Sequence, residues 1–172
     1  MTGSLLQIPL SREAAVTSQI TFRLFQRGDA LAFRVLNEAW IGRYFRLEEQ
    51  DRIQLGDPEE RILRNGGQIV MAIDGEERIG CCALVFLRPG VYEVAKMAVS
   101  ESYRGYGIGR KLLEYTIARA KALGAHTLEL ASNSKLANAV HLYESMGFRH
   151  LPPERVAPSP YARANVFMEL HL

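Results

Sequence analysis

Three glycines and two arginines between positions 104 and 110 form the stretch of this sequence with the clearest chemical use. The segment reads Arg-Gly-Tyr-Gly-Ile-Gly-Arg. Glycines let a ligand approach the backbone closely, and the arginines add positive charge. A helix that begins here would offer unpaired amides and the positive end of its dipole to an anion such as a pyrophosphate. On its own, the segment is also compatible with an unliganded glycine-rich turn.

The elements on either side are those that a phosphate site needs. Residues 91–99 are β-branched and apolar enough to predict a buried strand. From Ile108, apolar side chains recur at helical spacing as far as Leu123, and Gly124 supplies a stop signal. The predicted order is therefore strand, glycine loop, helix.

Two common nucleotide-binding motifs are excluded at this loop. Counted from Gly105, the sixth position is Arg110, where the dinucleotide fingerprint requires glycine. The P-loop pattern Gly-x-x-x-x-Gly-Lys-Ser/Thr does not occur anywhere in the sequence. The loop must therefore belong to another class of phosphate site, if it is one.

The pattern Arg104-x-x-Gly107-x-Gly109 resembles the acetyl-CoA loop of the GNAT acetyltransferase superfamily, Gln/Arg-x-x-Gly-x-Gly/Ala. Residues 141–148, His-Leu-Tyr-Glu-Ser-Met-Gly-Phe, resemble a second element of that fold, Leu-Tyr-x-x-x-Gly-Phe. The two motifs occur in the family's order. The resemblance extends from about Ile20 to the C-terminus.

The resemblance implies an α/β (α+β) fold in a single domain, with a mixed, mostly antiparallel central sheet flanked by helices. Residues 1–18 lack a sustained period and are expected to form a mobile N-terminal extension, whereas residues 19–172 form the GNAT-like domain. Besides the central strand and helix, strands are expected at 20–25, 68–73, 78–86, 127–131, 148–150 and 166–170, and helices at 30–40, 47–64 (in two pieces) and 134–146.

The resemblance also implies acetyl-CoA as co-substrate. In the family a backbone amide on the central strand, equivalent to Met97, faces the thioester carbonyl at a splay or bulge, and the pantetheine arm pairs with the strand. The sequence departs from the family at Leu136, where many members carry a cofactor-binding Asn; Asn133 is expected to substitute, and Asn138 is the weaker choice. The expected cofactor contacts are Met97, Ala98, Val99, Arg104, Gly105, Tyr106, Gly107, Ile108, Gly109, Arg110 and Asn133.

Acetyl transfer to an amine needs a base for the amine and a proton donor for the departing thiolate. Tyr143 resembles the family tyrosine near the thioester sulfur, and its alternative is a buried helix tyrosine. Glu93 has the offset of the glutamate that some members use as base. Its alternatives are a structural partner of Lys96, an exposed side chain, or a water chain without a dedicated base.

The loop before the last expected strand, residues 152–165, contains four prolines and is long for a compact domain, which favours a functional loop. Tyr161, Arg163 and Asn165, together with Arg155, are candidates to hold an acceptor carboxylate. The alternative is that Arg163 only ties the loop down. Residues 43–46 are further candidates, since this region walls the acceptor site in the GNAT fold; the alternative for each of them is a solvated helix junction.

The composition of the sequence excludes several classes of binding partner. The 172 residues contain 21 basic and 19 acidic side chains, for a net charge of +2, and apolar runs are too short to span a bilayer. Neither nucleic acid nor a membrane is expected, no histidine spacing suits a metal site, and no targeting signal is recognised. Cys81 and Cys82 point to opposite faces of a strand and are expected to be reduced core residues, which favours a cytoplasmic location.

These observations predict an N-acetyltransferase that moves acetyl from acetyl-CoA to a primary amine of a small molecule or peptide, by direct attack in a ternary complex. The alternative is a catalytically silent acetyl-CoA sensor or a partner-binding module. The acceptor and the acyl chain preference are not encoded in any motif, and a homodimer is left open.

Overall fold

One seven-stranded sheet organises the computed structural model, which describes residues 19–172; the expected N-terminal extension, residues 1–18, lies outside the described residues. The strand order is β1-β2-β3-β4-β5-β7-β6, and only the β4–β5 pair is parallel. The predicted fold class is confirmed. The strands are β1 (Ile20–Leu24), β2 (Gln68–Asp74), β3 (Glu77–Arg88), β4 (Val91–Val99), β5 (Thr127–Ser132), β6 (Arg149–His150) and β7 (Val166–His171).

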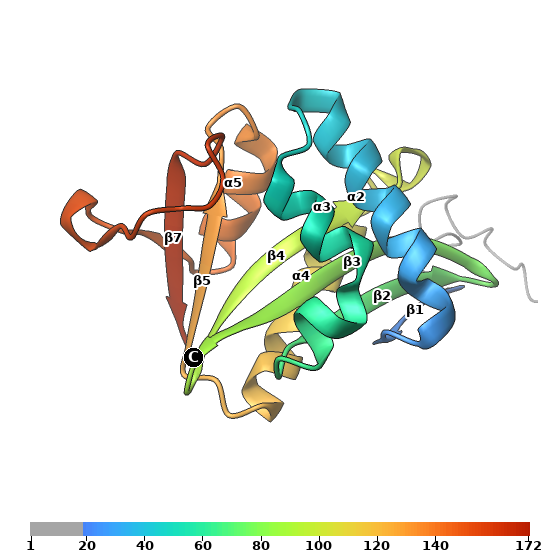
Figure 1. The fold of residues 1–172 in the computed structure, drawn as a ribbon. Helices are drawn as coiled ribbons and strands as arrows, with labels where there is room; N and C mark the ends of the chain where they lie inside the picture. Colours follow the sequence, from blue (N-terminus) through green and yellow to red (C-terminus); the bar gives the residue numbers. More distant parts are fainter. Residues whose placement is uncertain (1–18) are drawn as a thin grey trace, which may run out of the picture.

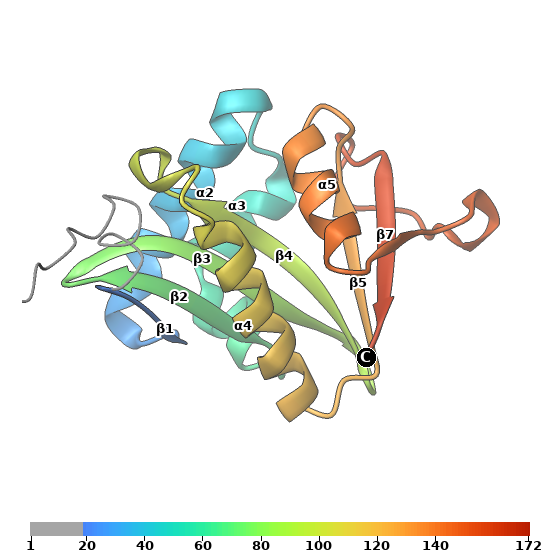
Figure 2. The same cartoon turned by 180° about the vertical axis from the view of Figure 1, so that it is seen from behind.

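Helices cover both faces of the sheet. Helices α2 (Ala30–Tyr44) and α3 (Glu49–Gly56), with the π-helical turn Glu59–Leu63, lie on one face (Figure 1). Helices α4 (Ile108–Ala122) and α5 (Ala137–Ser145) lie on the other (Figure 2). None of the helices between residues 19 and 172 combines the length and apolar character that a bilayer-spanning helix requires.

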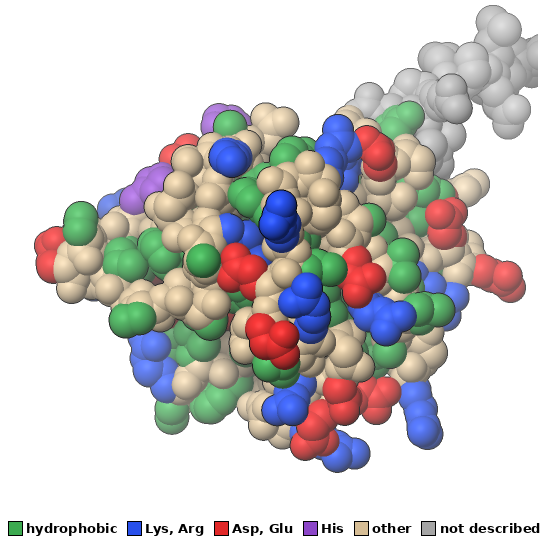
Figure 3. Space-filling view, turned by 45° about the horizontal axis from the view of Figure 1, so that its top comes forward, with side chains coloured by type: hydrophobic (Ala, Val, Ile, Leu, Met, Phe, Trp, Pro, Cys, Tyr) green, Lys and Arg blue, Asp and Glu red, His purple; other side chains and the backbone are tan. Residues whose placement is uncertain are grey.

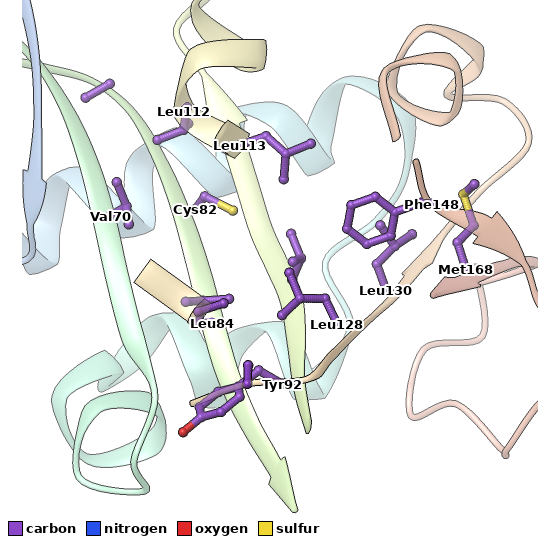
Figure 4. Packing of buried hydrophobic residues seen from close by; sticks show 14 of the residues in the cluster. Val70, Cys82, Leu84, Tyr92, Leu112, Leu113, Leu128, Leu130, Phe148 and Met168 are labelled. Carbon is purple, nitrogen blue, oxygen red and sulfur yellow. The ribbon is translucent and has the colours of Figure 1, made fainter. Parts of the chain in front are cut away.

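Two hydrophobic layers result, one on each face, because side chains alternate along the strands. Cys81 belongs to the layer under α2 and α3, and Cys82 to the layer under α4; both thiols are free and fully buried. Figure 4 shows the second layer, with Leu112 and Leu113 of α4 facing strand β3, which carries Cys82 and Leu84.

The helix predicted over residues 134–146 begins later, at Ala137. The Asn133 side-chain oxygen accepts a hydrogen bond from the Lys135 amide at 2.8 Å, and the Leu136 amide bonds to the Asn133 carbonyl at 2.9 Å. Such an asparagine turn competes with the first helical turn. The expected start was therefore wrong by three residues.

Strand β4 separates from β5 halfway along its length. The two strands pair only from Val91 to Glu93, opposite Thr127 to Glu129, and then diverge (Figures 1 and 2). Past Glu93, the edge of β4 that faces β5 is thus unpaired. The divergence opens space at the centre of the sheet.

Strand β4 also contains a bulge. Ala95 pairs with Ala83 and Ala98 with Cys81, so that two residues of β4, Lys96 and Met97, stand opposite the single Cys82 of β3. Lys96 has a left-handed backbone, with a φ of 51°. The bulge therefore lies in the part of β4 that no longer pairs with β5.

Candidate active site

The N-terminus of α4 presents an open backbone to solvent. Gly107 precedes the helix with a φ of 73°, and Gly105 has a φ of 83°. A Cβ atom at either position would meet nothing within 4 Å, so the approach to the loop is clear. The first helical amides have no intrahelical partners. The loop therefore has the form of an anion site.

A groove of about 440 Å³ leads from this loop along β4. Half of its lining residues come from α2 and from α5 with the segment before it, and the other half from β4, the glycine loop and the start of α4. The predicted cofactor residues that line the groove are Met97, Ala98, Val99, Arg104, Gly105, Gly107, Ile108 and Gly109.

Three predicted cofactor residues lie elsewhere. Tyr106 and Arg110 are not among the residues lining the groove, and Arg110 donates a hydrogen bond to the Ser145 hydroxyl at 2.6 Å. Asn133 is buried, and its amide donates to the Arg163 carbonyl at 2.5 Å, because it is used to fix the neighbouring loop. Asn138, the weaker choice, does line the groove.

Arg104 lies across the groove wall. Its guanidinium stands 4.7 Å from the centre of the Trp40 ring and 3.9 Å from the Glu101 carboxylate. Its Nε atom is buried and has no hydrogen-bond partner in the part of the chain that the structure describes. Arg104 thus contributes a positive charge to the groove wall.

A second, smaller cavity of about 110 Å³ lies where β4 and β5 diverge. It is lined by Glu93 and Lys96 of β4, by Tyr161 and Arg163 of the loop before β7, and by neighbouring apolar residues. The groove and the cavity share four lining residues, which mark their junction: Trp40, Met97, Leu136 and Tyr143.

Tyr143 of α5 stands at that junction. Its ring packs edge-on against Phe148, with 5.9 Å between the ring centres. Burial raises the pKa of its hydroxyl above the usual value for a phenol. Tyr143 therefore stays protonated at neutral pH and can act as a proton donor.

Glu93 of β4 also lines the small cavity. Burial raises the pKa of its carboxyl, against the opposing effect of Lys96. Among residues 19–172, no hydrogen bond joins the Glu93 carboxylate to another group, so this acid is not a direct structural partner of Lys96. A raised pKa without a fixed partner is typical of a carboxylate that exchanges protons.

Lys96 is instead bonded to Asp51, a residue that sequence reasoning missed. The Lys96 ammonium donates to Asp51 Oδ1 at 2.7 Å and to the Tyr161 hydroxyl at 2.8 Å, and this hydroxyl donates to Gln54 Oε1 at 3.1 Å. Arg163 donates to both Asp51 oxygens, at 2.6 and 2.8 Å. Five polar side chains from three distant segments thus form one network at the cavity wall.

The Asp51 carboxylate is completely buried. Burial alone would raise its pKa, but hydrogen bonds from Arg163 and Lys96 outweigh this effect and lower the pKa to about 2. Asp51 is therefore ionised throughout the physiological range. Nothing in the sequence distinguished it from an ordinary charged residue on a helix.

The predicted acceptor residues divide into two groups. Tyr161 and Arg163 line the small cavity, but Arg163 has both terminal nitrogens bonded to Asp51, as in the tying role that was the alternative. Asn165 bonds to Ser134, and Arg155 binds both oxygens of Glu169 at 2.7 Å. Neither of these two lines the cavity, because each side chain is used to fix the fold.

Residues 43–46 are also divided. Tyr44 lines the groove and Phe45 the small cavity, while Arg43 is paired with Glu101 and Arg46 lines neither space. Figure 3 shows acidic and basic side chains interspersed over the described surface on this side of the molecule.

Comparison with known proteins agrees with this arrangement. Residues 32–148 match the Acetyltransferase (GNAT) family. The chain is 33% identical over 105 residues to the uncharacterized N-acetyltransferase YvbK of Bacillus subtilis, covering 59% of this chain and 68% of that protein. It is 37% identical over 102 residues to the IAA acetyltransferase of Azospirillum brasilense, covering 58% of this chain and 61% of that protein.

Solved structures share the fold. A GNAT acetyltransferase of Staphylococcus aureus superposes with a TM-score of 0.80 at 23% identity, over 88% of this chain and 98% of that one. A GNAT acetyltransferase of Elizabethkingia anophelis, solved with acetyl-CoA bound, superposes with a TM-score of 0.60 at 20% identity, over 90% of this chain and 99% of that one. The family match covers more than half of the sequence and includes the glycine loop, β4 and Tyr143, so the chain belongs to the GNAT acetyltransferase family.

Proposed function

We propose that this protein is an N-acetyltransferase that moves acetyl from acetyl-CoA to a primary amine. One observation carries the proposal: a groove of about 440 Å³ and a cavity of about 110 Å³ meet at Met97 and Tyr143. A thioester that ends at this junction would lie next to an amine that enters through the smaller cavity. The reaction needs this proximity.

Binding of acetyl-CoA is supported by the backbone along the groove. The open amides at the start of α4 suit the pyrophosphate. The edge of β4 beyond Glu93 has no partner strand, so its main-chain groups are free to pair with the amides of the pantetheine arm. The Elizabethkingia anophelis relative was solved with this ligand.

The proposed reaction is a direct transfer. The amine nitrogen attacks the thioester carbon while a main-chain amide near Met97 stabilises the charge that develops on oxygen. The carbon–sulfur bond then breaks, and the Tyr143 hydroxyl gives its proton to the thiolate, whose pKa is about 8.5 as a free thiol. Cys81 and Cys82 are fully buried, and burial raises the pKa of both thiols, which argues against an acyl-cysteine intermediate.

In this proposal the acceptor ammonium gives one proton to Glu93 before the attack, and the proton that the nitrogen releases as the amide forms restores the Tyr143 hydroxyl. Met97 lies four positions after Glu93, which places their Cα atoms roughly 13 Å apart at most in an extended strand. One hydrogen bond cannot bridge that distance. The cavity of about 110 Å³ has room for several water molecules, so we infer that a short water chain carries the proton.

The acceptor is inferred to be a positively charged amine whose reactive end is narrow enough for a cavity of about 110 Å³. The guanidinium of Arg163 uses both terminal nitrogens on Asp51, and Lys96 is bonded to Asp51 and Tyr161. These two cations are therefore already committed within the protein. Glu93 is the charged group of the cavity lining that is left without such a bond, and it favours an acceptor that arrives as an ammonium ion.

A thiol-release assay with acetyl-CoA and a broad amine panel tests the proposal. We expect turnover by the wild type and a loss of about 10² to 10⁴ in kcat for Tyr143→Phe, with acetyl-CoA affinity unchanged. Tyr115→Phe is the matched control, since Tyr115 of α4 stacks against Phe22 of β1 and lines neither the groove nor the cavity. Full activity of Tyr143→Phe would remove the proton-donor role. Tight acetyl-CoA binding without turnover of any amine would identify a sensor instead.

A further inference from the structure

Lys96 combines three features that are unusual in a strand. It is the one residue other than glycine with a left-handed backbone among residues 19–172. Its side chain is only 5% exposed. It occupies the bulge of β4, one position before Met97. A lysine is disfavoured in each of these settings, so the surrounding contacts must hold it there.

Both the side chain and the carbonyl of Lys96 are held by neighbouring residues. The Lys96 ammonium is bonded to Asp51 of α3 and to the Tyr161 hydroxyl, and it lies 4.5 Å from the centre of the Tyr161 ring. The Lys96 carbonyl accepts a contact from the Cys81 thiol at 3.6 Å, and Cys81 in turn accepts one from Asn37 of α2 at 3.3 Å. The bulge is therefore fixed to three neighbouring elements.

The bulge decides which way the end of β4 faces. Ala95 and Ala98 face the α2–α3 side, opposite Ala83 and Cys81. Met97 faces the other side, since a Cβ on Gly109 of α4 would lie 3.5 Å from the Met97 methyl carbon. In a regular strand the positions would alternate without a reset, and Lys96 would point toward α4 and Met97 toward α3. The ion pair between Lys96 and Asp51 is thus compatible only with the bulged register.

We propose that Lys96 is a positioning residue whose bond to Asp51 locks the register of β4, so that Met97 faces the cofactor groove. This inference rests on the proposed transfer reaction. The same bond network includes Tyr161 and Arg163, so the loop that walls the acceptor cavity is coupled to the strand that holds the thioester. The position of the acceptor-side loop and the position of the thioester-side strand therefore depend on each other.

The test compares Lys96→Met with Lys96→Arg and with Lys121→Met, an exposed lysine of α4. Lys96→Met keeps an unbranched chain and leaves Asp51 bonded to Arg163 and to the Glu48 amide, so the fold should persist. We expect kcat to fall about tenfold or more, because misplacing the reacting groups by an ångström has effects of that size or larger. Affinity for CoA should change by less than about threefold, since the α4 loop is untouched.

Backbone hydrogen exchange gives a readout that does not depend on activity. Lys96→Met should accelerate exchange in residues 93–99 and in residues 158–165 together, whereas Lys96→Arg and Lys121→Met should leave both close to wild type. Tyr161→Phe, which removes only the hydroxyl that Lys96 contacts, should show the same paired effect more weakly. The Tyr161→Phe variant replaces Lys96→Met in this test if Lys96→Met fails to fold.

Acceleration confined to residues 158–165, or an unchanged kcat for Lys96→Met, would overturn the inference, because Lys96 would then only dock the loop. A wild type that binds acetyl-CoA but transfers to no amine would overturn the proposed function. In that case the paired exchange effect, or its absence, still decides whether Lys96 locks the register.

Discussion

At the residue scale, the protonation of Glu93 should govern how activity depends on pH. Burial raises the pKa of this carboxyl, and a base works only when it is ionised. We therefore expect wild-type kcat/KM to rise through an apparent pKa above the ordinary glutamate value of about 4.3. Glu93→Gln should remove this acid limb and lower the rate near neutral pH. Its rate should recover as the pH approaches the pKa of the acceptor amine.

Glu129 offers a matched control for that pH–rate profile. It pairs with Glu93 in the parallel register of β4 and β5, and its charge contributes to the raised pKa of Glu93. Glu129→Gln should therefore move the acid limb to lower pH and preserve the plateau. Superimposable profiles for wild type and Glu93→Gln would show that Glu93 is not the base.

Some of these residues were visible in the sequence and others were not. Glu93 and Tyr143 were found because the resemblance carries roles to individual positions. Lys96 was considered only as a partner of Glu93, and Asp51 was missed, because the bond between them joins positions 45 residues apart and neither has a local pattern. Arg163 was placed in the right region, but its partner Asp51 lies 112 residues away in the sequence. The loop sequence alone therefore could not predict this pairing.

At the scale of elements, the start of α4 should control cofactor affinity. Gly107 has a left-handed backbone with open space around it, so a valine there would strain the loop without a clash. Strain would turn the first amides of α4 away from the phosphates. We expect Gly107→Val to weaken acetyl-CoA binding at least about tenfold, or about 1.4 kcal/mol, by isothermal titration calorimetry.

The other end of the same helix supplies the control. Gly124 follows α4 with a φ of 78° and also has nothing within 4 Å of a hypothetical Cβ. Gly124→Val therefore imposes a similar strain far from the groove, and acetyl-CoA binding should be retained. Equal losses in both variants would point to general destabilisation of α4 as the cause.

The elements themselves were largely predictable, because their signals are local. The strands expected at 68–73 and 78–86 are β2 and β3, and they form a hairpin in which Asp74 pairs with Glu77. The bulge at Lys96 was expected only through the family, as a feature near Met97. No glycine or other turn residue marks it, since its unusual backbone is held by bonds to distant segments.

At the scale of the whole molecule, two buried aspartates should make stability depend on acid. Asp29 is fully buried between Arg23 and Arg78, and Asp51 between Lys96 and Arg163. Burial opposes ionisation of both, but hydrogen bonds from their partners lower each pKa from 3.8 to about 2. Their contribution to the unfolding free energy is therefore complete above pH 4 and is lost as the pH falls toward 2.

We expect each aspartate to account for roughly 1–2 kcal/mol of this acid-dependent loss. Urea unfolding between pH 2.5 and 7 measures it. Asp29→Asn should be less stable than wild type at pH 7 and should lose less stability on acidification. Asp57→Asn, at an exposed position, should retain the wild-type slope. An identical slope in wild type and Asp29→Asn would show that other groups cause the acid sensitivity.

The adjacent cysteines of β3 have a practical consequence. Cys81 lies in the layer beneath α2 and α3, Cys82 lies in the layer beneath α4, and each is fully buried. An alkylating reagent can label either thiol only after its own layer has opened. The thiols of two adjacent residues therefore report separately on the two hydrophobic layers. The order in which they are labelled gives the order in which the layer beneath α2 and α3 and the layer beneath α4 open.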